Sequence, residues 1–184
     1  MKKTVFLIAL VLLFYSSYGQ RIPSKFTFAN LELLIQPEVQ NRLIQKVHSW
    51  QQDANYLNAL QERKYSYFPV LSKALKQYNI PEDMAFLALQ QSNLLQIVGK
   101  AAYKDKAGLW QLTGTQVDEW RLALLINKKV DERRHIGLAA EAIAKRFSED
   151  NYTLRNWWNT ALAFHTSFMD VARNSTDTEK GATQ

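Results

Sequence analysis

Apolar residues recur at three- and four-residue spacing along most of the chain, which is the pattern of amphipathic helices. Residues 20–36 show no clear period and predict an extended arm, and residues 99–114 contain three glycines and predict an irregular connection. No stretch has a strong strand pattern, so the sequence predicts a mainly α fold. Helices are predicted over 37–60 (continuous, or restarting near Tyr56), 65–78, 81–95, 118–126, 131–147 and 156–173.

The helix predicted to begin at Pro81 has a polar residue on its apolar face. Proline suits a first helical turn, and Met84, Leu87, Gln91 and Leu95 then follow at helical spacing. An amide on such a stripe is either a hydrogen-bonded group at the edge of the core or part of the floor of a cleft. The pattern alone leaves both interpretations open.

The first residues have the features of a secretory signal peptide. Lys2 and Lys3 precede an unbroken apolar run over 5–14, and small residues lead to an expected cleavage site after Gly19. A membrane anchor needs about 20 apolar residues, more than this run provides. The chain has no cysteine, which excludes a lipoprotein and disulfides. We therefore expect an exported protein with no stable membrane insertion after cleavage.

Charge and composition exclude several classes of function. The formal charge of +6 falls to +4 without Lys2 and Lys3, and the remaining basic residues are scattered, which argues against nucleic-acid binding. The three histidines lie far apart in the sequence, and no motif for a nucleophile or a phosphate loop is present, so we expect no metal and no cofactor. The run 131–134 fits either a catalytic cluster or a helix start with its own capping and ion pairs.

Four sequence blocks resemble the lytic transglycosylases, most closely the membrane-bound D type. They are Tyr-Phe-Pro at 67–69, Tyr-Asn-Ile-Pro-Glu-Asp-Met at 78–84, Gly-Leu-Trp-Gln-Leu at 108–112 and Val-Asp-Glu-Arg-Arg at 130–134. The resemblance covers roughly residues 38–172. It implies a lysozyme-like, mainly helical fold with a peptidoglycan-binding groove, in the bacterial periplasm. The C-terminal cell-wall-binding repeats that the D type usually adds are not in this sequence.

The pattern and the resemblance together predict four segments. We expect a signal peptide over 1–19, an N-terminal arm and helix over 20–62 that packs on the domain, a lytic-transglycosylase-like domain over 63–173, and a disordered tail over 174–184.

The resemblance places the family's catalytic glutamate at Gln91. That glutamate precedes a serine, here Ser92, and serves as both acid and base while the sugar's own 6-hydroxyl closes an anhydro ring. A primary amide can neither donate nor accept a proton in this way near neutral pH. It keeps the volume of a glutamate and can still hydrogen-bond a sugar oxygen, so binding can survive where turnover does not.

Three further family motifs are altered. After the Gly-Leu-Trp-Gln block the chain lacks the family's Met-Pro and is one residue shorter, and His135 stands where the family's Asp-Glu-Arg-Arg block is followed by another aspartate. The family's Ala-Tyr-Asn-Ala-Gly motif aligns with residues 163–167, which puts Phe164 at the tyrosine and His165 at the asparagine. The blocks that support the fold persist, whereas those that form the site have changed together.

These observations predict a catalytically inactive pseudoenzyme that binds peptidoglycan glycan strands or serves as a scaffold for cell-envelope proteins. We expect a remnant groove near Trp110, lined by Gln91, Ser92, Gln111, Phe164 and His165.

Two alternatives remain at this stage. The first is an active lytic transglycosylase that uses a displaced carboxylate, with Glu119 or Asp118 favoured over Glu82 and Asp83, which lie about 12 Å from Gln91 along a helix. The second is a protein-interaction module without glycan binding, whose groove is filled by a partner or by the arm over 20–36.

Overall fold

The structure, a computed structural model, describes residues 23–96 and 104–181, with side chains described as far as Asn174. The expectation of a mainly helical fold is confirmed, because the described residues form seven α-helices and one small sheet. The elements in chain order are β1 (Lys25–Phe28), β2 (Leu31–Leu34), α2 (Pro37–Gln51), α3 (Ala54–Gln77), the 3-10 helix η1 (Glu82–Ala85), α4 (Phe86–Ser92), α5 (Gly114–Glu119), the 3-10 helix η2 (Glu132–Arg134), α6 (Ile136–Leu154), α7 (Trp157–His165) and α8 (Phe168–Gly181).

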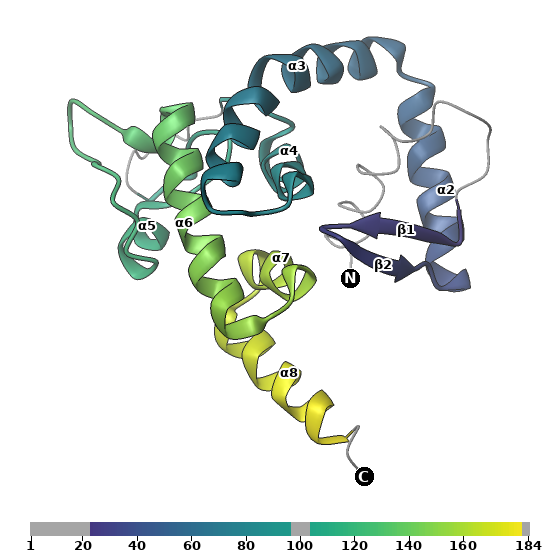
Figure 1. The fold of residues 1–184 in the computed structure, drawn as a ribbon. Coiled ribbons are helices and arrows are strands. Elements are labelled where there is room, and N and C mark those ends of the chain that lie inside the picture. Colours follow the sequence, from purple (N-terminus) through teal and green to yellow (C-terminus); the bar gives the residue numbers. More distant parts are fainter. Residues whose placement is uncertain (1–22, 97–103, 182–184) are drawn as a thin grey trace.

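Helix α3 connects the two sides of the molecule. Figure 1 shows the hairpin and α2 on one side, α4 to α8 on the other, and α3 running between them. We expected Pro69 near the start of a helix over 65–78, but α3 begins 11 residues earlier, at Ala54, and contains Pro69 in its interior. Proline cannot donate to the carbonyl of Tyr65, and the helix bends along its length (Figure 1). The boundary expected between 62 and 63 lies inside this continuous helix.

The N-terminal arm contains a β-hairpin, which corrects our expectation of an extended segment without strands. Strands β1 and β2 pair antiparallel, with Phe28 opposite Leu31. Both residues of the connecting turn have positive φ, 51° at Ala29 and 65° at Asn30, as in the type I′ turns that suit hairpins. The Ala29 N–H donates to Oδ2 of Asp83 at 2.9 Å, so the tip of the hairpin is fixed to η1.

The segment that begins at Pro81 lies at the centre of the core. A 3-10 turn over Glu82–Ala85 precedes α4, which ends at Ser92 because Asn93 and Leu94 adopt left-handed φ angles of 52° and 56°. Side chains are buried all around α4, not on one stripe only, since every residue from 84 to 89 is at most 5 % exposed. Leu95 lies beyond the helix and is 40 % exposed.

The expected helix over 118–126 is not formed. Instead α5 covers Gly114–Glu119, begun by a capping box in which the side chains of Thr113 and Gln116 each accept from the other residue's backbone N–H. It ends where Arg121 takes a positive φ of 51°, and the residues that follow are irregular. The apolar residues over 118–126 still enter the core, because Leu122 and Leu124 are each 9 % exposed.

The expected C-terminal helix over 156–173 is divided in two. Asn156 caps α7 by accepting from the backbone N–H groups of Trp158 and Asn159. The helix ends at His165, and α8 begins at Phe168. Helix α8 continues to Gly181, so most of the tail over 174–184 that we expected to be disordered is helical. Contacts of Phe168 with the preceding helices anchor its first turn, from which the helix extends. Among the described residues, no helix is both long and apolar enough to cross a membrane.

Candidate functional site

The ends of α4 and α7 meet at Gln91 and His165. The amide Nε2 of Gln91 lies 3.0 Å from Nδ1 of His165, and both side chains are half-buried. With the amide in this orientation its N–H donates to Nδ1, an arrangement that requires the neutral imidazole with its proton on Nε2. Among the described residues this is the one hydrogen bond of the Gln91 side chain, and its Oε1 remains available as an acceptor.

Ser92 holds this helix end to the loop that contains Gly108. Its side chain is 4 % exposed, and its hydroxyl donates to the carbonyl of Leu109 at 2.8 Å, with the Ala88 carbonyl at 3.2 Å. The structure therefore places Ser92 behind Gln91, within the core. Its contacts fix the C-terminal end of α4, and its hydroxyl is not presented to a ligand.

Gln111 is also turned inward. It has a φ of 50° and is 9 % exposed, and its amide donates to the carbonyl of Gly108 at 2.7 Å. Gly108 itself has a φ of 72°, and a Cβ there would lie 1.9 Å from the carbonyl oxygen of Arg133. Only glycine permits this close approach of two backbones.

A buried arginine ties the same loop to η2. Arg133 is 1 % exposed and pairs with Asp131 through Nη2–Oδ2 at 2.6 Å and Nε–Oδ1 at 2.8 Å. Its Nη1 donates to the carbonyls of Asp105 and Leu112. The hydrogen bond and charge of Arg133 lower the pKa of Asp131 from its ordinary value. The run 131–134 thus forms a capped turn with its own ion pair, one of the two interpretations that the sequence left open.

Phe164 is the centre of an aromatic cluster. Its ring contacts those of Trp110, Trp120 and Phe147, at centroid distances of 6.0, 5.6 and 5.3 Å. It is 9 % exposed. Of the five residues expected to line the groove, the structure therefore brings Gln91 and His165 into direct contact, and it places Ser92, Gln111 and Phe164 in the packing behind them.

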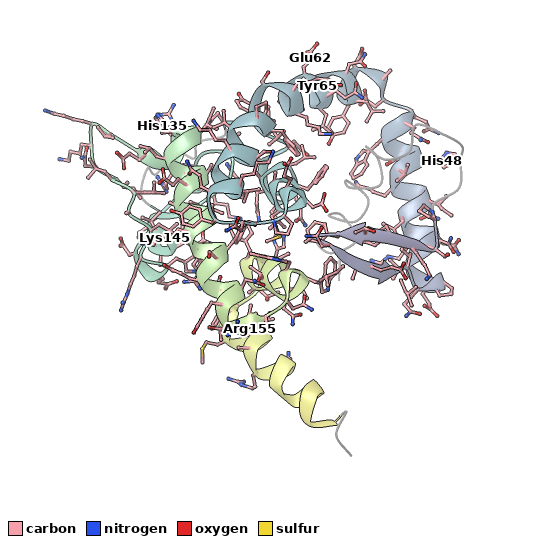
Figure 2. All side chains as sticks on the ribbon, viewed as in Figure 1. His48, Glu62, Tyr65, His135, Lys145 and Arg155 are labelled. Carbon is pink, nitrogen blue, oxygen red and sulfur yellow. The ribbon has the colours of Figure 1, made fainter. Side chains whose placement is uncertain are left out.

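Two hollows that the sequence analysis did not anticipate lie along α6, the helix on which Figure 2 labels Lys145. The N-terminal hollow, about 360 Å³, is bounded by Leu138 and Lys145; the C-terminal hollow, about 390 Å³, is bounded by Glu119 and Ser167. Trp120 and Arg146 line both and form a ridge between them. The sequence feature that could have indicated these hollows is the spacing of charged residues every three or four positions along α6.

An ion pair supports the ridge. Arg146 binds Asp150 through Nε–Oδ2 and Nη2–Oδ1, each at 2.9 Å, and the two side chains are 20 % and 10 % exposed. Burial raises the pKa of Asp150 above its ordinary value despite the opposing effect of Arg146. Within the described ranges, no three histidine or acidic side chains gather closely enough to hold a metal ion.

Comparison with known proteins adds no relative. No protein-family model, curated protein or solved structure matches the chain.

Proposed function

We propose that this chain is an exported protein with a lysozyme-like fold, similar to lytic transglycosylases, that binds peptidoglycan glycan strands without cleaving them. The observation that supports it best is the contact between Gln91 and His165 at 3.0 Å. It joins two family motifs that are 74 residues apart in sequence, at the position where the resemblance expects the groove. The Ser92 hydroxyl donates a hydrogen bond to the Leu109 carbonyl, which brings a third motif, the block over 108–112, close to the same end of α4.

The chemistry of this pair favours binding over cleavage. Gln91 has no proton to give to a leaving oxygen, and its hydrogen bond goes to a neutral imidazole. The remaining amide oxygen and N–H can instead accept from and donate to sugar hydroxyl and acetamido groups. His165, which the alignment puts at the family's asparagine, adds a polar ring beside the Gln91 amide.

The displaced-carboxylate alternative has less support. Among the described residues no carboxylate hydrogen-bonds to Gln91, and Glu119 faces the C-terminal hollow, which Gln91 does not line. The neighbouring Asp118 is exposed. An active lytic transglycosylase would need one of these groups to reach the scissile bond from across the aromatic cluster.

The described part of the arm, residues 23–36, is anchored away from the Gln91–His165 pair, which weakens the alternative of a filled groove. The tip of the hairpin is buried, with Phe28 packed edge-on against Trp158 at a centroid distance of 5.8 Å. Trp158 lies seven residues before His165 on α7, about 10 Å along the helix. The expected signal peptide over 1–19, with cleavage after Gly19, lies outside the described residues, so export to the periplasm is part of this proposal.

Co-sedimentation with purified sacculi tests the proposal. We expect the protein without residues 1–19 to bind sacculi, and the double variant Gln91→Ala/His165→Ala to bind at least about tenfold more weakly, because the amide that would bind the sugar and the ring that positions it are both removed. The control is His48→Ala, an exposed histidine on α2 on the other side of the molecule from α6 (Figure 2). Release of anhydro-muropeptides by the parent protein, but not by the double variant, would contradict the absence of catalysis.

A further inference from the structure

A groove of about 860 Å³ lies along α3 and shares no lining residue with either hollow on α6. It extends from Lys64 to Gln77, a length of about 20 Å along the helix, and Glu82 of η1 closes one side. The ring of Tyr65 is 78 % exposed and lines this groove. Tyrosine is enriched where proteins bind other proteins, so we examined the α3 groove as an interaction surface.

The α3 groove consists of a stripe with a lysine on each side. The stripe contains aromatic and small side chains that follow one another at three- and four-residue spacing: Tyr65, Phe68, Pro69 and Ser72. Lys64 and Lys73 both line the groove and are nine positions apart in α3, which is about two and a half helical turns. They therefore lie on opposite sides of the stripe.

The groove is held in place at the end where Lys64 lies. The ring of Phe68 packs edge-on against the buried ring of Phe86, with the centroids 5.2 Å apart. The Lys64 ammonium lies 5.4 Å and 5.7 Å from these two centroids. Burial lowers the pKa of Lys64, because its ammonium loses part of its hydration. A carboxylate brought to this position would stabilise the charge that has lost water.

The lining of the groove has an excess of positive charge. It includes three lysines and one acid, Glu82, whose Oε1 lies 2.6 Å from Nζ of Lys76. The hydrogen bond and charge of Lys76 lower the pKa of Glu82, so this carboxylate is ionised at neutral pH and balances that lysine. The other two lysines are those beside the stripe. The groove thus complements an apolar ligand that has negative charge on both of its sides.

The geometry favours a helix over an extended peptide or a lipid bilayer. The backbone of α3 is hydrogen-bonded within the helix except where Pro69 cannot donate, so it offers no strand edge for an extended peptide. A helix satisfies its own backbone groups. A flat anionic bilayer in contact with Tyr65 would also approach Glu62, an exposed acid labelled beside Tyr65 in Figure 2 that lies outside the groove.

We propose that the α3 groove binds an amphipathic helix of a partner protein, whose apolar stripe packs on Tyr65 and whose carboxylates on either side pair with Lys64 and Lys73. This arrangement is that of a coiled-coil seam, in which the charges beside the apolar positions determine the choice of partner. A partner helix of about 14 residues spans the groove. The proposal is independent of the glycan-binding function, because neither Gln91 nor His165 lines the groove.

Synthetic helical peptides test this site. The probe is a peptide of about three heptads with leucine at positions a and d and glutamate at e and g, and the reference probe has lysine at e and g. In fluorescence anisotropy titrations we expect the purified protein to bind the acidic peptide at least about tenfold more tightly than the basic one. Lys73→Glu should weaken binding of the acidic peptide about tenfold, and Tyr65→Ala about five- to tenfold.

Matched controls lie on α6, outside the groove. Lys145→Glu makes the same charge change at an exposed lysine, and Tyr152→Ala removes a tyrosine that is 72 % exposed. Neither should change the affinity for the acidic peptide. Equal weakening by Lys145→Glu would show general charge attraction and would overturn the site on α3. No binding of the acidic peptide, or equal binding of both peptides, would also overturn it.

Two further measurements separate other occupants of the groove. The first is binding to phosphatidylglycerol vesicles, and the second is self-association in sedimentation equilibrium. Vesicle binding that Tyr65→Ala abolishes would assign the groove to a membrane surface, and self-association that the same variant abolishes would assign it to a second copy of the chain. Either result would overturn a partner helix as the occupant. A parent protein that stays monomeric and leaves the vesicles unbound, while it binds the acidic peptide, supports the proposal.

Discussion

The amide Nε2 of Gln91 and Nδ1 of His165 share one hydrogen bond of 3.0 Å, which couples the orientation of the amide to the tautomer of the ring. With the amide N–H as donor, the imidazole is neutral with its proton on Nε2, and the amide presents Oε1 away from the ring. Protonated His165 would have a donor at both ring nitrogens, so the Gln91 amide would have to flip to keep the bond. Neither side chain supplies the acid and the base that glycan cleavage needs from one group.

Gln91→Glu tests the proposal that the chain binds glycan without cleaving it. We expect lytic activity on sacculi to remain undetectable, at least about 10²-fold below that of an active enzyme, because the new carboxylate would pair with His165 instead of staying protonated. The opposite charge should raise the pKa of His165 relative to the parent protein, which NMR titration of its ring protons measures. Strong release of anhydro-muropeptides by this variant would show that only the proton-transferring group had been lost.

Gly108 is the position where a single added methyl group should be most costly. Gly108→Ala would force a side chain onto a φ of 72° and a Cβ to 1.9 Å from the Arg133 carbonyl, so we expect a loss of about 2–4 kcal/mol in the free energy of unfolding. Gly137→Ala is the matched control, because its Cβ meets only the His135 ring at 3.5 Å and α6 favours alanine. That control should be neutral or stabilising by about 0.5–1 kcal/mol. Urea denaturation measures both.

At the scale of elements, the sequence predicted helices best where a start signal and an apolar period coincide. Pro37 begins α2 as expected, and the period of α6 continues through its core residues. The hairpin was missed because its turn is Ala-Asn rather than a glycine turn, although Phe26 and Phe28 alternate with polar residues. No glycine or proline marks the interruption before α8, so the apolar pattern over 156–173 predicted a single helix.

The hairpin should contribute to stability through its tip. Phe28 is fully buried and contacts Trp158 at 5.8 Å, so Phe28→Ala should lower the free energy of unfolding by about 3–4 kcal/mol. Leu34→Ala removes an apolar side chain from the same hairpin, but Leu34 is 65 % exposed, and we expect a change within about 0.5 kcal/mol. Equal effects of the two substitutions in thermal or urea unfolding would mean that the tip does not anchor the hairpin.

At the scale of the whole molecule, the sequence could place residues on helices but could not predict how deeply their side chains are buried. It predicted that Gln91 and His165 share a site, and the two are in contact. It could not show that Ser92 and Phe164 are buried behind them, because burial follows from the packing of loops far apart in sequence. The two hollows along α6 could not be predicted for the same reason. Trp120, which lines both, lies in a segment that was predicted to be helical and is irregular in the structure.

Two buried ion pairs should give the molecule opposite responses to acid. The pKa of Asp131 is lowered by Arg133, so its contribution to stability is present above its unfolded pKa of about 3.9 and is lost as the pH falls through the folded value. The pKa of Asp150 is raised by burial, so its contribution is full below about pH 3.9 and is lost as the pH rises through the folded value.

The corresponding asparagine variants should therefore diverge between pH 7 and pH 3. Asp131→Asn leaves Arg133 buried without its partner and should cost about 3–5 kcal/mol at pH 7. That cost shrinks as the pH falls below about 3.9, because the unfolded parent then takes up a proton that the folded parent does not. The cost of Asp150→Asn should instead grow toward pH 3, because only the parent gains from protonating a buried carboxylate. Urea unfolding of the parent and both variants across this range gives the two slopes. Slopes of the same sign would mean that burial does not outweigh Arg146 in setting the pKa of Asp150, and that the ridge between the hollows carries a fully ionised pair under all conditions in which the fold is stable.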